Sequence, residues 1–169
     1  NSLYLIMTES CQMNCPFCYT KFCTGFENDN SILDPDLAVK VIKKGFTRDN
    51  KTFEPFDHII FHGGEPLLYP DNISYIIDKV VQFNPKIDFG IQTNLAYKEL
   101  SKKQIQLLIR LGGYGTSYSY DRFAGQEDIE RMVINNIKYL ATLGIYGTLL
   151  ITITEDHINN QSPHHLAQY

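Results

Sequence analysis

The sequence predicts an α/β fold in which parallel strands alternate with outer helices, as in part of a (β/α) barrel. Short apolar runs alternate along the chain with segments whose apolar residues recur every three or four positions. The expected strands start near residues 57, 87, 115 and 147, about 28–32 residues apart, which is the length of one βα unit. Strict alternation of strand and helix favours a parallel sheet with helices outside it.

Each element has its own signal. The strand candidates are the apolar runs Leu3–Met7, His58–His62, Ile87–Gln92, Gly115–Tyr120 and Gly147–Ile153. Two helical segments carry a clear apolar stripe, formed by Ile73, Ile76, Ile77, Val80 and Val81 in one and by Ile129, Met132, Val133, Ile137 and Leu140 in the other.

Polar residues indicate where the helices begin. Asp34 opens the first predicted helix, Asp71 caps the second, and Ser101 with Gln104 forms a capping box for the third.

Composition limits the classes of function. The chain has 169 residues, enough for one domain, with 43% hydrophobic residues and a net charge of −4 from scattered charges. This balance argues against a nucleic-acid substrate, and no apolar run approaches a membrane span. No secretion signal is present, so we expect a cytoplasmic protein without a membrane partner. Because the chain begins with Asn1, we expect it to start inside a longer gene product.

Three cysteines lie within eight residues in the loop after the first strand. Cys11, Cys15 and Cys18 have the spacing Cys-x3-Cys-x2-Cys. Three thiolates can hold three corners of an iron–sulfur cube and leave one iron free to bind a substrate. We expect Cys23 to be a half-buried free thiol. In the alternative, Cys23 or a histidine completes a tetrahedral zinc site, or a fourth cysteine completes a fully thiolate-bound cluster. Clustered cysteines favour an intracellular metal site over a disulfide framework.

Further polar groups follow the later strands, where parallel sheets collect their chemistry. The second strand is followed by two glycines, an acid and a proline, in which the carboxylate could accept a hydrogen bond from an ammonium group. A tight turn with an exposed carboxylate is the simpler interpretation. These residues are Gly63, Gly64, Glu65 and Pro66. After the third strand, Gln92, Thr93 and Asn94 could bind a ribose or a carboxylate, or form a turn.

The cysteine motif, with the aromatic Phe17 before its third cysteine, resembles the signature of the radical S-adenosylmethionine (SAM) enzymes. The resemblance implies a partial TIM-like (β/α)6 barrel and a 4Fe–4S cluster whose open iron binds the amino and carboxylate groups of SAM. Reductive cleavage of SAM would then give a 5′-deoxyadenosyl radical that abstracts hydrogen from a substrate. The turn at Gly63–Pro66 resembles the family's GGE motif, which implies that Glu65 binds the methionyl ammonium.

The resemblance also implies roles at the later strand ends. It places a ribose contact at residues 92–94, and it makes Ser119 a contact of the SAM carboxylate. Arg122 stands where the family has glycine, so the role of the neighbouring Asp121 stays open between substrate chemistry and helix capping. In the fifth strand, Leu149 or Ile151 would face the adenine, with core packing as the alternative, and we take Ile151 as the candidate.

The run from His62 to Leu68 most resembles the SPASM-type, sulfatase-maturase-like branch, which modifies peptides and proteins. This implies a peptide or protein substrate and an external electron donor of the flavodoxin or ferredoxin type. One alternative is a radical enzyme that acts on a small molecule or nucleotide. The other is a non-catalytic domain that binds a metal. We expect residues 1–169 to be an incomplete radical SAM core domain, truncated after about the fifth strand, with any auxiliary-cluster domain beyond it.

Overall fold

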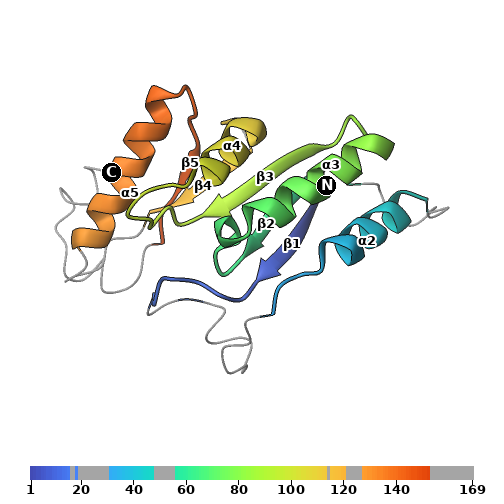
Figure 1. Cartoon of the computed structure of the whole chain (residues 1–169), viewed down its shortest axis with the longest axis horizontal. Coiled ribbons are helices and arrows are strands. Elements are labelled where there is room, and N and C mark those ends of the chain that lie inside the picture. The colour runs from blue at the N-terminus through green and yellow to red at the C-terminus, as the bar shows by residue number, and fades with distance from the viewer. Residues whose placement is uncertain (16–17, 19–30, 48–55, 114, 121–126, 153–169) are drawn as a thin grey trace.

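The computed structural model describes residues 1–15, 18, 31–47, 56–113, 115–120 and 127–152. Strands and helices alternate along these residues (Figure 1). The strands are β1 (Ser2–Thr8), β2 (His58–Gly63), β3 (Asp88–Thr93), β4 (Thr116–Ser119) and β5 (Thr148–Leu150). The helices are α2 (Pro35–Thr47), α3 (Pro70–Phe83), α4 (Lys102–Leu111) and α5 (Glu127–Thr142), and the short 3₁₀ helix η1 (Pro66–Leu68) follows β2.

The five strands form one parallel sheet whose spatial order is the order of the sequence, β1-β2-β3-β4-β5. Every neighbouring pair is parallel. In a doubly wound sheet the strand order reverses once, whereas in a barrel each strand lies beside the next. The predicted α/β class with parallel strands is confirmed, and the strand order is that of part of a barrel.

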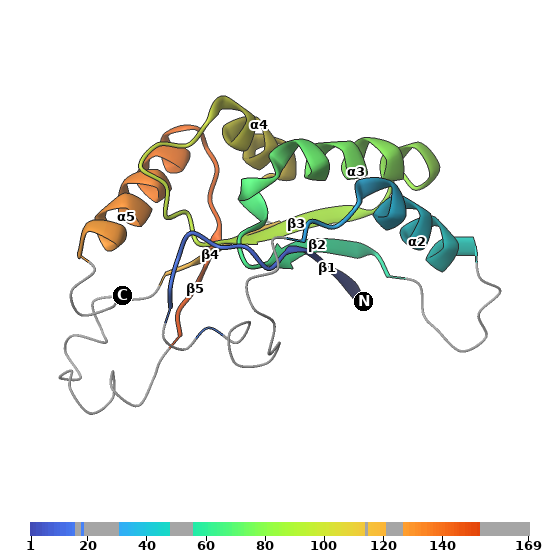
Figure 2. The same ribbon diagram turned by 60° about the horizontal axis from the view of Figure 1, so that its bottom comes forward.

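The helices cover one face of the sheet. Figure 2 shows α2, α3, α4 and α5 on the same side of the strands. In β1 the side chains of Leu5 and Met7, which face the helices, are buried, whereas Tyr4 and Ile6 between them are 57% and 48% exposed. On the helix side, the predicted apolar stripe of α3 packs into the core, because Ile73, Ile76, Ile77 and Val80 are all buried. The described residues therefore bury one face of the sheet and leave the other open.

Two of the three predicted helix starts are confirmed. The Oδ1 atom of Asp34 accepts hydrogen bonds from the backbone N–H groups of Asp36 and Leu37, at 2.8 and 3.2 Å. Ser101 and Gln104 form the reciprocal capping box, in which each side chain accepts from the backbone of the other residue.

The prediction that Asp71 caps α3 is wrong. The helix begins at Pro70, the N-cap is Tyr69, and no side chain bonds the cap. Proline is well suited to the first helical position because it lacks an N–H group, and its presence there moves the start of the helix before Asp71. Asp71 instead pairs with Lys103 of α4, at 2.5 Å.

The last two strands are shorter than predicted. β4 spans Thr116–Ser119, and β5 spans only Thr148–Leu150, with the predicted end at Ile153 outside the described residues. Within the described residues β5 pairs with β4 alone, so its ladder extends only along the three positions 117–119 of that short partner. Separately, none of the helices in the described ranges has the length and apolar character needed to cross a bilayer.

Candidate functional site

The turn after β2 packs directly on the chain that leads to the cysteines. The backbone N–H of Gly64 donates to the carbonyl of Thr8 at 2.7 Å, and that of Glu65 donates to the carbonyl of Ser10 at 2.9 Å. A Cβ atom on Gly63 would collide with the Thr8 carbonyl, and one on Gly64 would collide with the carbonyls of Ser10 and Glu9. Gly63 also has a φ of +128°, which side chains disfavour. We call this contact between residues 8–10 and the two glycines the glycine seam.

Glu65 is fully buried beneath the seam. Its Oε1 accepts hydrogen bonds from the backbone of Leu67 at 3.0 Å and from the hydroxyl of Thr93 at 2.7 Å. Its Oε2 accepts one from the backbone of Asn94 at 2.8 Å. Burial raises the pKa of Glu65 to about 7, although these three donors act in the opposite direction. All three donors are neutral, so the carboxylate is oriented but its charge is only partly compensated.

A second buried polar group lies beside this carboxylate. The hydroxyl of Tyr97 is buried and makes no well-aligned hydrogen bond. Burial raises the pKa of Tyr97, and the nearby charge of Glu65, toward which the hydroxyl donates, raises it further. A buried acid beside a buried hydroxyl can receive a ligand that carries a cationic and a hydrogen-bonding group.

The three motif cysteines lie on the loop after β1, and each is half-buried. The Sγ atom of Cys11 accepts hydrogen bonds from the backbone N–H of Met13 at 3.3 Å and from Nδ2 of Asn94 at 3.4 Å. Burial raises the pKa of Cys11, and the charges of Glu65 and Cys18 contribute in the same direction. The backbone N–H of Cys18 donates to the carbonyl of Cys15 at 3.2 Å.

Among the described residues, no three potential metal ligands lie close enough together to hold an ion. The donor set still fits an iron–sulfur cluster, because its three thiols are half-buried on one loop and Cys11 and Cys18 are close enough for their charges to interact.

Asn94 connects the cysteine loop with the buried carboxylate. Its backbone bonds Glu65, while its side chain bonds Cys11 and accepts a hydrogen bond from Nε2 of Gln12 at 3.0 Å. Two regions more than 80 residues apart in the sequence thus meet at the carboxyl ends of β1, β2 and β3. The structure brings together Cys11, Gly63, Gly64, Glu65, Thr93 and Asn94, but it uses Thr93 and Asn94 to orient other side chains, where the sequence suggested a ribose contact.

The remaining candidates lie around this group. Pro66 is buried and begins η1. Gln92 is half-buried at the end of β3, on the open face, in register with Ser117. Ser119 ends β4 in register with Leu150, whereas Leu149 is in register with the buried Tyr118.

The register changes the expectation for the adenine contact. Side chains alternate between the two faces along a strand. Leu150 therefore lies on the same face of the sheet as Ser119, whereas Leu149 and Ile151, the residue after β5, lie on the opposite face. All three residues 149–151 are more than a third exposed. Phe17, Cys23 and Asp121 lie outside the described residues.

Three residues of this site escaped the sequence analysis. Gln12 stands between motif cysteines as an apparent spacer, yet its side chain reaches Asn94. Tyr97 follows β3 but carries no motif. Asn136 of α5 is buried and donates to the carbonyls of Leu95 and Tyr97, at 2.9 and 2.7 Å. Only Asn136 had a usable signal, since it is a polar residue on the apolar stripe of its helix.

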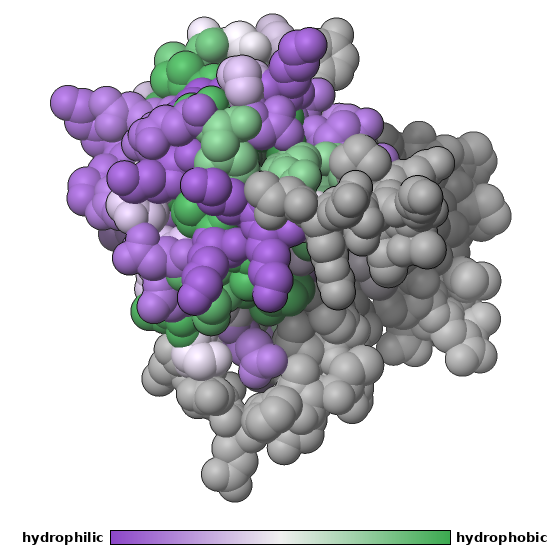
Figure 3. All heavy atoms as spheres, turned by 90° about the vertical axis from the view of Figure 1, so that its right-hand side faces the viewer, coloured by the Kyte–Doolittle hydropathy of each residue, from purple (hydrophilic) through white to green (hydrophobic). Residues whose placement is uncertain are grey.

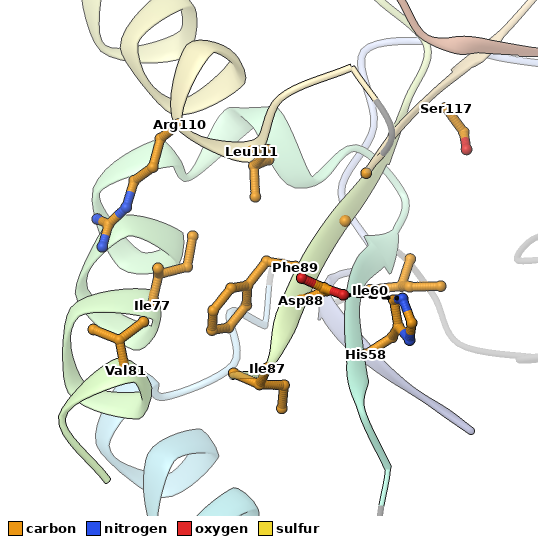
Figure 4. Close-up of a pocket in the computed structure, with 12 residues that line it drawn as sticks. His58, Ile60, Ile77, Val81, Ile87, Asp88, Phe89, Arg110, Leu111 and Ser117 are labelled. Atoms are coloured by element: carbon orange, nitrogen blue, oxygen red, sulfur yellow. Dashed lines mark ion pairs between the residues drawn. The ribbon is translucent and has the colours of Figure 1, made fainter. Parts of the chain in front are cut away.

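The opposite edge of the sheet contains a cavity of about 640 Å³. It lies beside the beginning of β3 and is lined by apolar side chains such as Ile77, Val81 and Phe89 (Figure 4). Arg110 pairs with Asp78 at 2.7 Å, and the ring of His58 lies 3.5 Å from the carboxylate of Asp88. Figure 3 views the molecule from this side and shows mostly hydrophilic side chains around smaller apolar areas. No group of polar atoms converges in the cavity, so we do not assign the chemistry to it.

Comparisons with known proteins agree with this geometry. The sequence pattern of the Radical SAM superfamily matches residues 5–167. The radical SAM cyclopropyl synthase TigE of Paramaledivibacter caminithermalis is 25% identical over 184 aligned positions, which cover 94% of this chain and 37% of TigE. An uncharacterized protein of Archaeoglobus fulgidus is 27% identical over 118 positions, which cover 64% of this chain and 23% of that protein.

A solved structure has the same fold. Native anSMEcpe with bound AdoMet and the Kp18Cys peptide matches with a TM-score of 0.64 and 17% identity, over 92% of this chain and 44% of that chain. This chain thus spans less than half the length of TigE and of anSMEcpe. Because the superfamily pattern covers nearly the whole sequence, the chain belongs to the Radical SAM superfamily, whose members are enzymes that use a 4Fe–4S cluster and SAM.

Proposed function

We propose that this chain is the core domain of an enzyme in which Cys11, Cys15 and Cys18 hold the cluster and the Gly63–Pro66 turn binds SAM, and that the enzyme modifies a peptide or protein. When bound, the reduced cluster supplies the electron that cleaves SAM to methionine and a 5′-deoxyadenosyl radical, which takes hydrogen from the substrate. One observation carries the proposal: Asn94 touches both a motif cysteine and the buried carboxylate of Glu65.

Glu65 is the proposed acceptor for the methionyl ammonium of SAM. In the structure its donors are neutral, and burial raises its pKa to about 7. A cation bound beside it would favour the ionised form and offset part of the cost of burying that charge. The hydroxyl of Tyr97 lies beside this carboxylate and can contact the same ligand. The carboxylate is already oriented, so little conformational entropy is lost on binding.

Gln92 and Ser119 are proposed to contact SAM from the open face of the sheet. Both are half-buried and lie at the ends of neighbouring strands, on the face that the helices do not cover. An amide and a hydroxyl at these places can bind ribose hydroxyls or a carboxylate. On the same face we now favour Leu150 over Ile151 for the adenine, because Leu150 is in register with Ser119.

A peptide or protein substrate and membership of the SPASM-type, sulfatase-maturase-like branch are part of the proposal. The peptide in the anSMEcpe structure, whose fold this chain shares, favours the peptide substrate. Each turnover that consumes SAM also consumes an electron, so we propose an external donor of the flavodoxin or ferredoxin type. The rest of the barrel and any auxiliary-cluster domain are proposed to belong to a longer protein.

The deciding experiment is anaerobic reconstitution of the full protein with iron and sulfide. We expect about four iron and four sulfide per chain, and release of 5′-deoxyadenosine after reduction in the presence of SAM. Cys15→Ala should abolish both the cluster and the product. One zinc per chain without sulfide, or 5′-deoxyadenosine from the Cys15→Ala variant, would contradict the proposal. Loss of the cluster on Cys23→Ala would indicate a site with four cysteines.

A second experiment tests the role of Glu65. Glu65→Gln should weaken SAM binding by about tenfold or more, the usual effect of losing a hydrogen bond to a charged group, while the iron and sulfide content stays unchanged. Glu99→Gln is the matched control, because Glu99 is exposed in the loop before α4. Equal SAM affinity in both variants would remove Glu65 from the site.

A third experiment tests the substrate class. The reduced enzyme is incubated with SAM and a short peptide encoded beside its gene, and the peptide is analysed by mass spectrometry. A change in peptide mass that requires SAM supports the peptide class. An unchanged peptide, in the presence of active SAM cleavage, favours a small-molecule or nucleotide substrate.

A further inference from the structure

We infer that Asn94 is a positioning residue that acts together with Gln12. The two side chains hold Cys11 in place for the cluster, and the N–H···S hydrogen bond from Asn94 raises the cluster's reduction potential. The inference rests on the proposed function, because it takes Cys11 to be a cluster ligand. It assigns Asn94 a role toward the protein's own sulfur in place of a contact with SAM.

The surrounding backbone fixes the orientation of the Asn94 amide. Its Oδ1 lies 2.8 Å from the backbone nitrogen of Ala96. A backbone N–H group can only donate, so the side-chain atom facing it must be the oxygen. The other end of the amide, Nδ2, is therefore the atom that lies 3.4 Å from Sγ of Cys11. The contact is a hydrogen bond from nitrogen to sulfur.

Gln12, in the cysteine loop, holds the Asn94 amide in this orientation by hydrogen bonds. Its Nε2 donates to Oδ1 of Asn94 at 3.0 Å and also lies 3.4 Å from the carbonyl oxygen of Ala96. Both partners are acceptors, so the orientation of this amide is fixed as well. A residue within the cysteine motif is thus tied to the loop after β3 at Asn94 and at Ala96.

The loop that carries Asn94 is itself held in an unusual conformation. Leu95 has a φ of +51°, in the left-handed region that residues with a side chain seldom adopt. Asn136 stabilises this bend by donating to the carbonyls of Leu95 and Tyr97, and the hydroxyl of Thr93 accepts from the backbone of Leu95 at 3.2 Å. The bend turns the chain so that Asn94 faces the cysteines. Backbone strain held by several surrounding contacts is typical of functional sites.

Two N–H groups thus point at the sulfur of Cys11, one from Asn94 and one from the backbone of Met13. Hydrogen bonds to cluster sulfurs and ligand thiolates are among the features that set the reduction potential of an iron–sulfur cluster. Each donor stabilises the added negative charge of the reduced state. Removal of the Asn94 donor should therefore make the cluster harder to reduce.

Asn94→Asp tests this inference with the smallest change of shape. The aspartate keeps the oxygen that accepts from Ala96 and Gln12 and keeps the backbone N–H to Glu65, but it replaces the donor to sulfur with a second oxygen. We expect a lower midpoint potential in a redox titration of the reconstituted protein followed by electron paramagnetic resonance, without SAM. Asn94→Leu removes the same donor without adding a charge and should also lower the midpoint potential, which separates the loss of the hydrogen bond from the effect of the new carboxylate.

Gln12→Met is a further variant, because it removes the hydrogen bond from Gln12 and leaves the Asn94 amide intact. We expect a smaller shift in the same direction, and this variant decides the question if Asn94→Asp fails to fold. Wild-type potentials in the variants that retain a cluster would overturn the inference. A wild-type protein without a cluster would instead overturn the proposed function, so the two failures are distinguishable.

Discussion

The two edges of the sheet contain different kinds of space. At the carboxyl edge, polar side chains from β1, β2 and β3 converge around Glu65 and Cys11 and satisfy most of one another's hydrogen bonds. At the amino edge, a cavity of about 640 Å³ is lined mainly by apolar side chains, and Arg110 at its wall pairs with Asp78. The cavity is thus the less specific of the two places. Convergence of polar groups, and not volume, locates the site in this protein.

One carboxylate at each edge shows the same difference. Asp78 is exposed and pairs with Arg110, at the wall of the amino-edge cavity, at 2.7 Å. Burial raises the pKa of Glu65 at the carboxyl edge to about 7. A solvated carboxylate beside a guanidinium is already stabilised, whereas a buried one with neutral donors gains from a cationic ligand.

The largest expected effect concerns the glycine seam. Gly64→Ala should reduce the free energy of unfolding by about 3 kcal/mol or more, because its Cβ would meet main-chain carbonyls that cannot move independently of the cysteine loop. Gly144→Ala is the matched control. Gly144 also has a positive φ, +75°, but nothing lies within 4 Å of its Cβ position, so the expected cost is about 1 kcal/mol. If urea unfolding shows that both variants lose the same free energy of unfolding, the glycine seam is not closely packed.

The second effect is a pH dependence caused by Glu65. Folding raises the pKa of this acid from 4.5 to about 7, so the folded state binds more protons than the unfolded state between these values. The stability of the cluster-free protein should therefore fall as pH rises from 4.5 to 7, by up to about 3 kcal/mol. Glu65→Gln should remove this slope. Unfolding measured at several pH values checks both, and a slope that persists in the variant would assign it to another group.

A smaller effect is expected from the support behind the site. Asn136→Ala leaves two buried carbonyls without their donor, at a cost of about 2 kcal/mol. Asn135→Ala, on the neighbouring exposed position of α5, should cost less than about 0.5 kcal/mol. Thermal unfolding of the two variants measures the difference. If both are neutral, the bend at Leu95 does not depend on α5.

The smallest effect is expected at the amino edge. Val81→Leu adds one methylene group at the wall of the cavity and should change the free energy of unfolding by less than about 1 kcal/mol. SAM affinity should stay the same, because the cavity lies at the opposite end of the strands. Weaker SAM binding in this variant would break the distinction between the two edges.

The sequence predicted the elements better than their contacts. The period of the apolar residues located the strands and α3, because burial on one face imposes that period. The start of α3 was misplaced because Pro70 could take the first helical position. Which side chains of the fifth strand face the helices could not be predicted from the sequence, because this depends on the register of the strand with β4.

The site was predicted as separate motifs, and the connections between them were not. Asn94 was expected to contact a ligand or to form a turn. Its side chain accepts from the backbone of Ala96, as in a turn, and also bonds Cys11. The positive φ at Leu95 accompanies this arrangement, and leucine gives no signal for that conformation. The glycines at 63 and 64 were expected to make room for a ligand, and in the structure they make room for the cysteine loop. Local sequence identifies a reactive group, whereas its partner depends on tertiary packing.

The glycine seam also has a consequence for how this region can change during evolution. The partners of the two glycines are the main-chain carbonyls of residues 8–10, and every amino acid supplies a carbonyl. The steric constraint therefore falls on positions 63 and 64, whereas the side chains at positions 9 and 10 can change without disrupting the glycine seam. Homologues should accordingly differ freely on one side of this contact and be nearly invariant on the other.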